Sequence, residues 1–338
     1  MRFLSDNTAG ACPEVMAALQ EVNHGRVPAY GEDEWTRRLD GVLGGYFGTA
    51  VRAFPVISGT AANALALATL SPPYGAIFAH EESHIAVDEC GAPGFFSGGA
   101  QLMLLPGEHG RVKVESIRAA LGHLRGDVHN VQPAALSLVQ ATDLGTAYRP
   151  DELRALSEFA HGRGMKVHMD GARFANVVAF LGCHPGDITW RAGIDVLSFG
   201  ATKNGCMAAE AVVFFDPALA RDFELRRKRA GHLLSKLRFL SAQLLAYVET
   251  GACQRNAAKA NRLAQQIARA AGGSLLHPVE ANEVFVSLGE ERRKALRAAG
   301  FEFYDWGPEE AGAARLVVSW DQPEDEVRAL CAALERTA

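Results

Sequence analysis

The fold is decided by residues 166–205, KVHMDGARFANVVAFLGCHPGDITWRAGIDVLSFGATKNG. Residues 166–170 predict a short buried strand that ends on a carboxylate, and residues 195–203 predict a second strand followed by a Gly-flanked turn that carries a lysine. Between them, apolar residues recur at helical spacing over 173–181. This order and length are typical of a strand–crossover–strand unit. Because ligands of open α/β sheets bind at the carboxyl ends of the strands, we expect the carboxylate and the lysine to meet at a ligand-binding edge.

A carboxylate and a lysine amine at this edge would suit pyridoxal phosphate. The Lys203 amine can form a Schiff base with its aldehyde, and Asp170 can keep its pyridine nitrogen protonated so that the ring accepts electrons. Asp170 could equally cap the helix that follows it, and Thr202–Gly205 could be a solvated turn. These residues alone leave both interpretations open.

Composition and charge argue against several classes of protein. The 338 residues are enough for one large domain and a smaller one, and 48% hydrophobic with 22% charged residues is typical of a globular protein. A net charge of −5 and a pI near 6.1 argue against nucleic-acid or anionic-membrane partners. The chain shows no apolar run of membrane-spanning length and no signal-peptide core, so we expect a cytoplasmic protein. The six scattered cysteines favour reduced thiols over disulfides or a metal site.

A second candidate feature is an anion-binding site at Ser58, Gly59 and Thr60. Residues 54–57 predict a strand and residues 61–70 a helix, so these small residues would lie at a helix N-terminus. Free backbone N–H groups and the helix dipole favour a phosphate there. A plain Ser or Thr N-cap would have the same sequence.

The remaining elements follow an α/β order. Further helices are expected at 13–22, 32–47, 114–124 and 151–163 and in an interrupted stretch over 217–247, and further strands at 75–80, 101–105, 134–140 and 211–215. Over the last ninety or so residues, the predicted order of elements is helix, strand, helix, strand, strand and helix. We therefore expect an N-terminal arm over 1–24, a large domain over 25–245 and a small C-terminal α/β domain over 246–338.

Three other features are candidates for binding. His84 follows a predicted strand end, where its ring could stack on a flat cofactor or simply be hydrogen-bonded at the surface. Arg315 lies near the start of a predicted strand and could hold a substrate carboxylate or form a surface salt bridge. The basic run 226–229 is typical of a solvated face, but it could also supply phosphate ligands across a dimer interface.

In this order, the segments resemble the threonine aldolase group (low-specificity L-threonine aldolases and phenylserine aldolases) of the β-eliminating lyases, which are fold-type I pyridoxal-phosphate enzymes. The most specific match is Val167–Arg173 together with the lysine turn Thr202–Gly205. Supporting matches are Ser5-Asp6, Tyr30–Asp33, Ser58–Thr60, Ser83–Ile85 and Arg315–Val317. The resemblance implies a three-layer α/β sandwich like that of aspartate aminotransferase, with a smaller C-terminal domain.

The resemblance also implies residue roles. Lys203 would form the Schiff base, Asp170 would pair with the pyridine nitrogen, His84 would stack on the ring, and His129 would approach the substrate's β-hydroxyl. The cofactor site would be completed by Ser58, Gly59, Thr60, Arg173, Thr202 and Arg238. The substrate site would consist of Ser5, Tyr30, Arg173 and Arg315. Tyr30 and Arg238 would reach it from a neighbouring subunit of a homotetramer built as a dimer of dimers.

The implied activity is cleavage of L-threonine and related L-β-hydroxy-α-amino acids, aryl analogues included, to glycine and an aldehyde. Another pyridoxal-phosphate lyase, an aminotransferase, or a ligand-binding protein that kept the fold without the chemistry are the alternatives. Where many relatives have Glu-Asn-Thr-His-Asn and Ser-Lys-Gly, this chain has Gln140–Leu144 and Thr202–Gly205, so the preferred β-substituent and stereochemistry stay open. The catalytic base could be His84, His129 or an ordered water.

Overall fold

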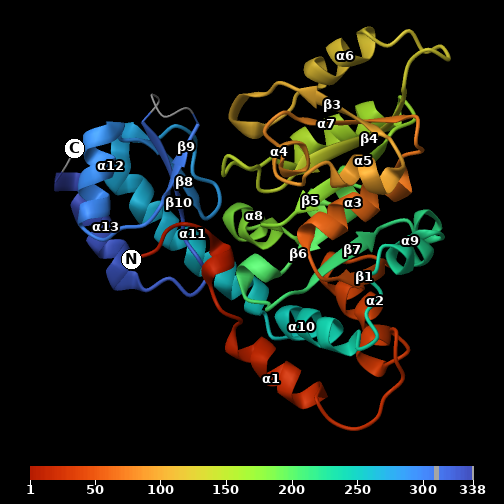
Figure 1. Cartoon of the computed structure of the whole chain (residues 1–338), viewed down its shortest axis with the longest axis horizontal. Coiled ribbons are helices and arrows are strands. Elements are labelled where there is room, and N and C mark those ends of the chain that lie inside the picture. The colour runs from red at the N-terminus through yellow and green to blue at the C-terminus, as the bar shows by residue number, and fades with distance from the viewer. Residues whose placement is uncertain (308–311, 337–338) are drawn as a thin grey trace.

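The computed structural model describes residues 1–307 and 312–336, and its centre is a seven-stranded mixed sheet (Figure 1). The strand order is β1-β7-β6-β5-β4-β2-β3. The strands are β1 (Arg52–Val56), β2 (Gly75–His80), β3 (Gln101–Leu105), β4 (Gln132–Val139), β5 (Lys166–Gly171), β6 (Val196–Gly200) and β7 (Glu210–Phe214). Strands β3, β2, β4, β5 and β6 run parallel, whereas β7 is antiparallel to both of its neighbours.

The predicted strand–crossover–strand unit is β5, α8 (Phe174–Leu181) and β6. The two strands are parallel neighbours, with Asp170 opposite Ser198 in the register. Both faces of the sheet are covered, which explains why these strands are nearly continuous apolar runs rather than alternating ones. The expectation of an α/β sandwich is confirmed.

Helices pack on both faces of the sheet and make three layers (Figure 1). One layer is formed by α1 (Pro13–Val22), α2 (Glu34–Phe47), α6 (Val114–Gly122), α7 (Pro150–His161), α8 and α10 (Arg238–Glu249). On the other face, α3 (Gly59–Leu70) and α9 (Phe223–Arg229) pack against β1, β6 and β7, and α5 (Ala92–Ser97) packs on α3. Helix α3 is buried over most of its length, which its Ala- and Leu-rich sequence permits.

A smaller α/β unit follows the large sheet. Its antiparallel strands have the order β8 (Glu283–Ser287), β10 (Ala313–Val317) and β9 (Tyr304–Trp306). Helices α11 (Ala252–Ala271), α12 (Gly289–Ala298) and α13 (Glu324–Arg336) accompany this sheet. The predicted boundary between residues 245 and 246 falls within α10.

The N-terminal arm joins this small unit. The Phe3 N–H donates to the Glu302 carbonyl at 2.8 Å, and the Val317 N–H donates to the Phe3 carbonyl at 2.9 Å. The Phe3 side chain is fully buried in the apolar core of the small unit. The arm therefore begins as part of the small sheet and then runs toward the large one.

The segments that the sequence did not predict are short. Helix α4 (His84–Val87) and α5 contain too few residues to show a helical period. The interrupted stretch 217–247 forms α9 and α10 separated by a turn after Ala230. Within the described ranges, no helix combines the length and apolarity needed to cross a membrane.

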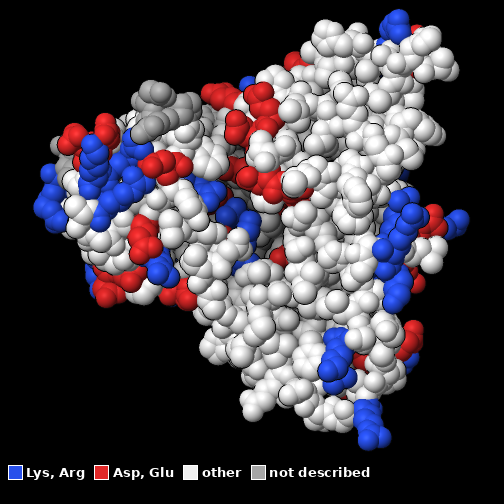
Figure 2. All heavy atoms as spheres, viewed as in Figure 1, with Lys and Arg blue, Asp and Glu red and all other residues white. Residues whose placement is uncertain are grey.

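Figure 2 shows a hollow between the small unit and the large sheet, with both acidic and basic side chains gathered in it and on its rim. Another group of basic side chains lies over α9, where the run 226–229 is located. The charged hollow, rather than the basic helix, is the feature that adjoins the strand ends.

Candidate functional site

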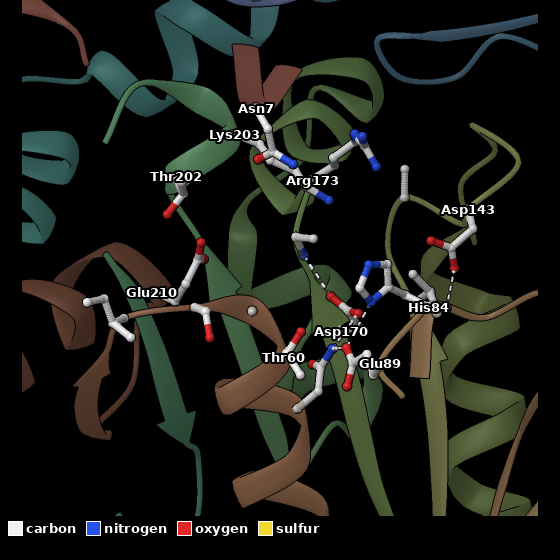
Figure 3. Close-up of a pocket in the computed structure, with 17 residues that line it drawn as sticks. Asn7, Thr60, His84, Glu89, Asp143, Asp170, Arg173, Thr202, Lys203 and Glu210 are labelled. Carbon is white, nitrogen blue, oxygen red and sulfur yellow. Dashed lines mark hydrogen bonds and ion pairs between the residues drawn. The ribbon is translucent and has the colours of Figure 1, made fainter. Parts of the chain in front are cut away.

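A cavity of about 280 Å³ lies at the edge of the sheet where the parallel strands end (Figure 3). Most of its lining comes from the ends of β1, β2, β4, β5 and β6 and the segments that follow them, and Asn7 of the N-terminal arm completes it. Because β7 is antiparallel, its first residue, Glu210, reaches the same edge. The cavity brings together Ser58, Gly59, Thr60, His84, Asp170, Arg173, Thr202 and Lys203, all of which the sequence predicted as site residues.

Asp170 is buried and held in a fixed orientation. Its Oδ2 accepts a hydrogen bond from Asn63 Nδ2 at 2.7 Å, and its Oδ1 accepts one from the Ala172 N–H at 2.9 Å. Asn63 Nδ2 also donates to Glu89 Oε1 at 2.9 Å. Asn63 therefore joins the carboxylate predicted for the pyridine nitrogen to the residue that supports His84.

Lys203 lies in a tight turn that packing fixes in place. Asn204 is buried and its Nδ2 donates to the Tyr247 hydroxyl at 2.6 Å and to the Cys253 carbonyl at 2.8 Å. Gly205 has a φ of 119°, and a Cβ there would lie 2.7 Å from Asn256 Nδ2. These constraints explain the sequence Lys-Asn-Gly at this point and direct the preceding lysine into the cavity.

The predicted anion-binding site lies at the start of α3. Ser58 is the N-cap residue, and its Oγ accepts a hydrogen bond from the Ala61 N–H at 3.3 Å. Gly59 and Thr60, in the first turn of α3, line the cavity, and the free N–H groups of a helix N-terminus favour an anion. Glu210 lies on the same side as Thr202 in Figure 3, and burial raises the pKa of its carboxyl to about 7.

His84 is supported by a carboxylate that the sequence did not reveal. Its Nδ1 lies 2.9 Å from Glu89 Oε1. This hydrogen bond raises the pKa of His84, although burial opposes the shift. Burial in turn raises the pKa of Glu89. No sequence signal identified Glu89, whereas Asn63 could have been noticed as an amide within an otherwise apolar helix.

A smaller cavity of about 150 Å³ adjoins the first and opens toward the small unit. Ser5, Trp306 and Arg315 line only this cavity, whereas Arg173 and Lys203 line both. The Arg315 guanidinium lies 5.3 Å from the Trp306 ring centroid and 5.4 Å from that of Tyr304. Its Nε is buried without a hydrogen-bond partner within the described ranges. Such an unpaired donor beside a cavity is suited to a carboxylate ligand.

Arg173 is held by two acidic residues. Its Nε and Nη2 donate to the two carboxylate oxygens of Asp6 at 2.8 and 3.0 Å, and its Nη1 lies 3.3 Å from Glu283 Oε2. Burial would lower the pKa of Arg173, but Asp6 and Glu283 outweigh it and raise the pKa. The guanidinium therefore stays charged in the wall between the two cavities.

Three predicted site residues do not line either cavity of this chain. His129 is exposed in the loop before β4, at the opposite edge of the sheet, where its N–H donates to Asp127 Oδ1 at 2.9 Å. Tyr30 is 50% exposed, and Arg238 Nε donates to the Val22 carbonyl at 3.0 Å. Their roles at a site shared between subunits stay predictions.

Comparison with known proteins places this site in a family. The model of the beta-eliminating lyase family matches residues 2–291. The chain is 46% identical to low-specificity L-threonine aldolases of a Pseudomonas species and of Pseudomonas aeruginosa. These matches cover 98% and 97% of the chain and 96% and 95% of the relatives.

Solved structures agree with this relationship. Leishmania major threonine aldolase superposes with a TM-score of 0.93 at 25% identity, over 100% of this chain and 99% of that one. Serine palmitoyltransferase of Sphingomonas wittichii, at 17% identity, has a TM-score of 0.74 over 100% of this chain and 87% of that one, which shows the shared fold alone.

Proposed function

The chain belongs to the beta-eliminating lyase family, and from this we propose that it cleaves L-threonine and related L-β-hydroxy-α-amino acids to glycine and an aldehyde. The near full-length similarity to low-specificity L-threonine aldolases supports the reaction. The observation that carries the proposal is the pair of joined cavities, one containing Asp170 and the other Arg315, with Lys203 lining both. This arrangement suits a flat cofactor beside an amino acid.

The larger cavity fits pyridoxal phosphate by the chemistry of its donors. Asp170 would face the pyridine nitrogen, because its hydrogen bonds to Asn63 and Ala172 hold its carboxylate in a fixed orientation. The first turn of α3 would hold the phosphate, and Lys203 would take the aldehyde. When bound, the cofactor supplies an electron sink for the bond that breaks at the substrate's α-carbon.

The residues of the chain bind and orient the amino acid. Arg315 would bind the carboxylate of the amino acid through paired N–H donors, and Ser5 would be a further contact in the same cavity. Arg173 supplies fixed positive charge nearby, since Asp6 and Glu283 hold its guanidinium in place. Fixing the carboxylate determines which bond at the α-carbon is aligned for cleavage, and orientation of this kind contributes much of the rate.

Product analysis tests this function. Purified protein with added pyridoxal phosphate is offered L-threonine and, in parallel, L-phenylserine, and we expect glycine with acetaldehyde or benzaldehyde. The ratio of the two rates gives the preferred β-substituent. Lys203→Ala is the matched variant and should form neither product. A keto acid without glycine would contradict the proposal and favour an aminotransferase.

A further inference from the structure

Asp143 lies where the two cavities of the site meet. It lines both of them, together with Asn7, His84, Arg173 and Lys203. Arg315 lines only the smaller cavity and Asp170 only the larger one. A bond between the α- and β-carbons of an amino acid held by Arg315 must therefore lie near the residues that line both cavities.

The Asp143 carboxylate has one oxygen available. Its Oδ2 accepts a hydrogen bond from the His84 N–H at 3.1 Å, whereas its Oδ1 has no hydrogen-bond partner in the part of the chain that the structure describes. The side chain is half-buried, and Figure 3 shows it on the same side of the cavity as His84. The free oxygen can accept a proton from a ligand without breaking an existing contact.

The turn that carries Asp143 is held in place. The Thr142 N–H donates to the Thr146 carbonyl at 2.9 Å, and the two threonine hydroxyls lie 2.9 Å apart. The Gln140 N–H donates to the Asp170 carbonyl at 2.8 Å. Asp143 is therefore positioned by the same strands that position Asp170, and a fixed group is what proton transfer requires.

Other groups at the site are less suited to accept a proton. The hydrogen bond to Glu89 raises the pKa of His84, so its imidazole is protonated over a wider pH range. His129 lines neither cavity. Asp170 is engaged by Asn63 and Ala172, and Glu210 lies away from Asp143 beside Thr202 in Figure 3.

Burial and the charges around Asp143 together set the pKa of its carboxyl. Burial raises the pKa of its carboxyl to about 7, with Asp170 and Glu283 acting in the same direction and His84 and Lys203 opposing them. The Arg173 guanidinium also faces it. A base is most effective when its pKa lies near the working pH. The ionised fraction of Asp143 rises as pH increases through about 7.

We propose that the Asp143 carboxylate takes the proton of the substrate's β-hydroxyl when the Cα–Cβ bond is cleaved; this rests on the function proposed above. The O–H bond breaks, its proton passes to Asp143, and the electron pair left on oxygen forms the C=O bond of the aldehyde. The Cα–Cβ electron pair remains with the glycine fragment, whose α-carbon takes up a proton. Asp143 then releases its proton to water, so no net proton is consumed.

The test compares two reactions of the holoenzyme carrying Asp143→Asn. Cleavage of L-phenylserine should fall by about 10²–10³-fold in kcat, and the rise of activity with pH near 7 should disappear. Exchange of the glycine α-proton with deuterated water, followed by NMR, needs no β-hydroxyl and should be unchanged. Asp143→Glu should recover part of the cleavage, and Asp151→Asn, at an exposed position on α7, should behave as wild type.

Each alternative outcome has a definite meaning. Cleavage that persists in Asp143→Asn with its pH profile intact would overturn the proposal. A parallel loss of cleavage and of glycine exchange would also overturn it, because Asp143 would then only position His84. Wild-type protein that exchanges the glycine proton but cleaves neither substrate would instead contradict the proposed function itself, and this proposal with it.

Discussion

At the scale of single residues, the surroundings of Arg315 suit a carboxylate ligand. The rings of Tyr304 and Trp306 flank its guanidinium, and such stacking leaves the edge of the plane for hydrogen bonds. Its buried Nε is unpaired in the described part of the chain, which costs free energy unless a ligand satisfies it. Binding of the substrate carboxylate would remove this cost.

We therefore expect Arg315→Ala to raise KM for L-threonine about 10–100-fold, because a charge-assisted hydrogen bond contributes roughly 1.5–3 kcal/mol. Arg315→Lys should recover less than half of the lost binding free energy, since lysine keeps the charge but not the planar pair of N–H donors. Steady-state kinetics measures both effects. Arg328→Ala, at an exposed position on α13, is the control. An unchanged KM in Arg315→Ala would remove this residue from the substrate site.

Single residues also show what sequence could and could not predict here. The placement of Asp170 and Lys203 at one edge of the sheet was predictable, because Asp170 lies at the end of β5 and Lys203 lies in the turn that follows β6. Their supporting partners were not: Asp6 and Glu283 contact Arg173 from positions 167 residues before it and 110 residues after it. Such contacts depend on tertiary packing, which periodicity and turn signals do not encode.

At the scale of elements, β5 contains a buried polar link across the middle of the sheet. His168 lies between β4 and β6, with its Nδ1 2.9 Å from Ser137 Oγ and its Nε2 2.9 Å from Ser198 Oγ. The three residues are buried, so the two hydroxyls satisfy an imidazole that has no access to water. Burial lowers the pKa of His168 to about 4.

This depressed pKa predicts an acid-sensitive fold. An unfolded histidine titrates near pH 6.5, so below that pH the unfolded chain binds a proton that the folded chain excludes. Stability should fall by up to about 3 kcal/mol between roughly pH 6.5 and pH 4 from this group, and no further below. His168→Asn should be less stable than wild type at pH 8, because its hydrogen bonding is weaker. Between pH 8 and pH 5, however, the variant should lose less stability than wild type does. Urea unfolding at both pH values measures this, and equal pH dependence in both proteins would refute it.

Elements with strong local signals were predictable with accurate bounds. The helix 13–22 begins at a proline, and the strands 75–80 and 101–105 are bounded by small or turn-forming residues. The four-residue helix α4, which begins at His84, was not predictable because one turn has no measurable period. The turn after β4 was seen only as a departure from the family pattern, yet it carries Asp143.

At the scale of the whole molecule, the N-terminal arm links the small unit to the site. Phe3 is buried in the small core, Ser5 lines the smaller cavity, and Asp6 holds Arg173. These three contacts fall within residues 3–6, so we expect a change at one end of this short segment to shift the other. The arm should therefore couple the stability of the small unit to substrate binding.

Phe3→Ala tests this coupling. Removing a fully buried phenylalanine should lower the free energy of unfolding by about 3–5 kcal/mol. Because Ser5 and Asp6 follow directly, the variant should also raise KM for the amino acid. This rise should exceed any loss of affinity for pyridoxal phosphate, because Ser5 lines only the smaller cavity. Met16→Ala, which truncates a side chain that is 46% exposed on α1, is the control for both measurements. A large loss of stability with an unchanged KM would show that the arm anchors the small unit without adjusting the site.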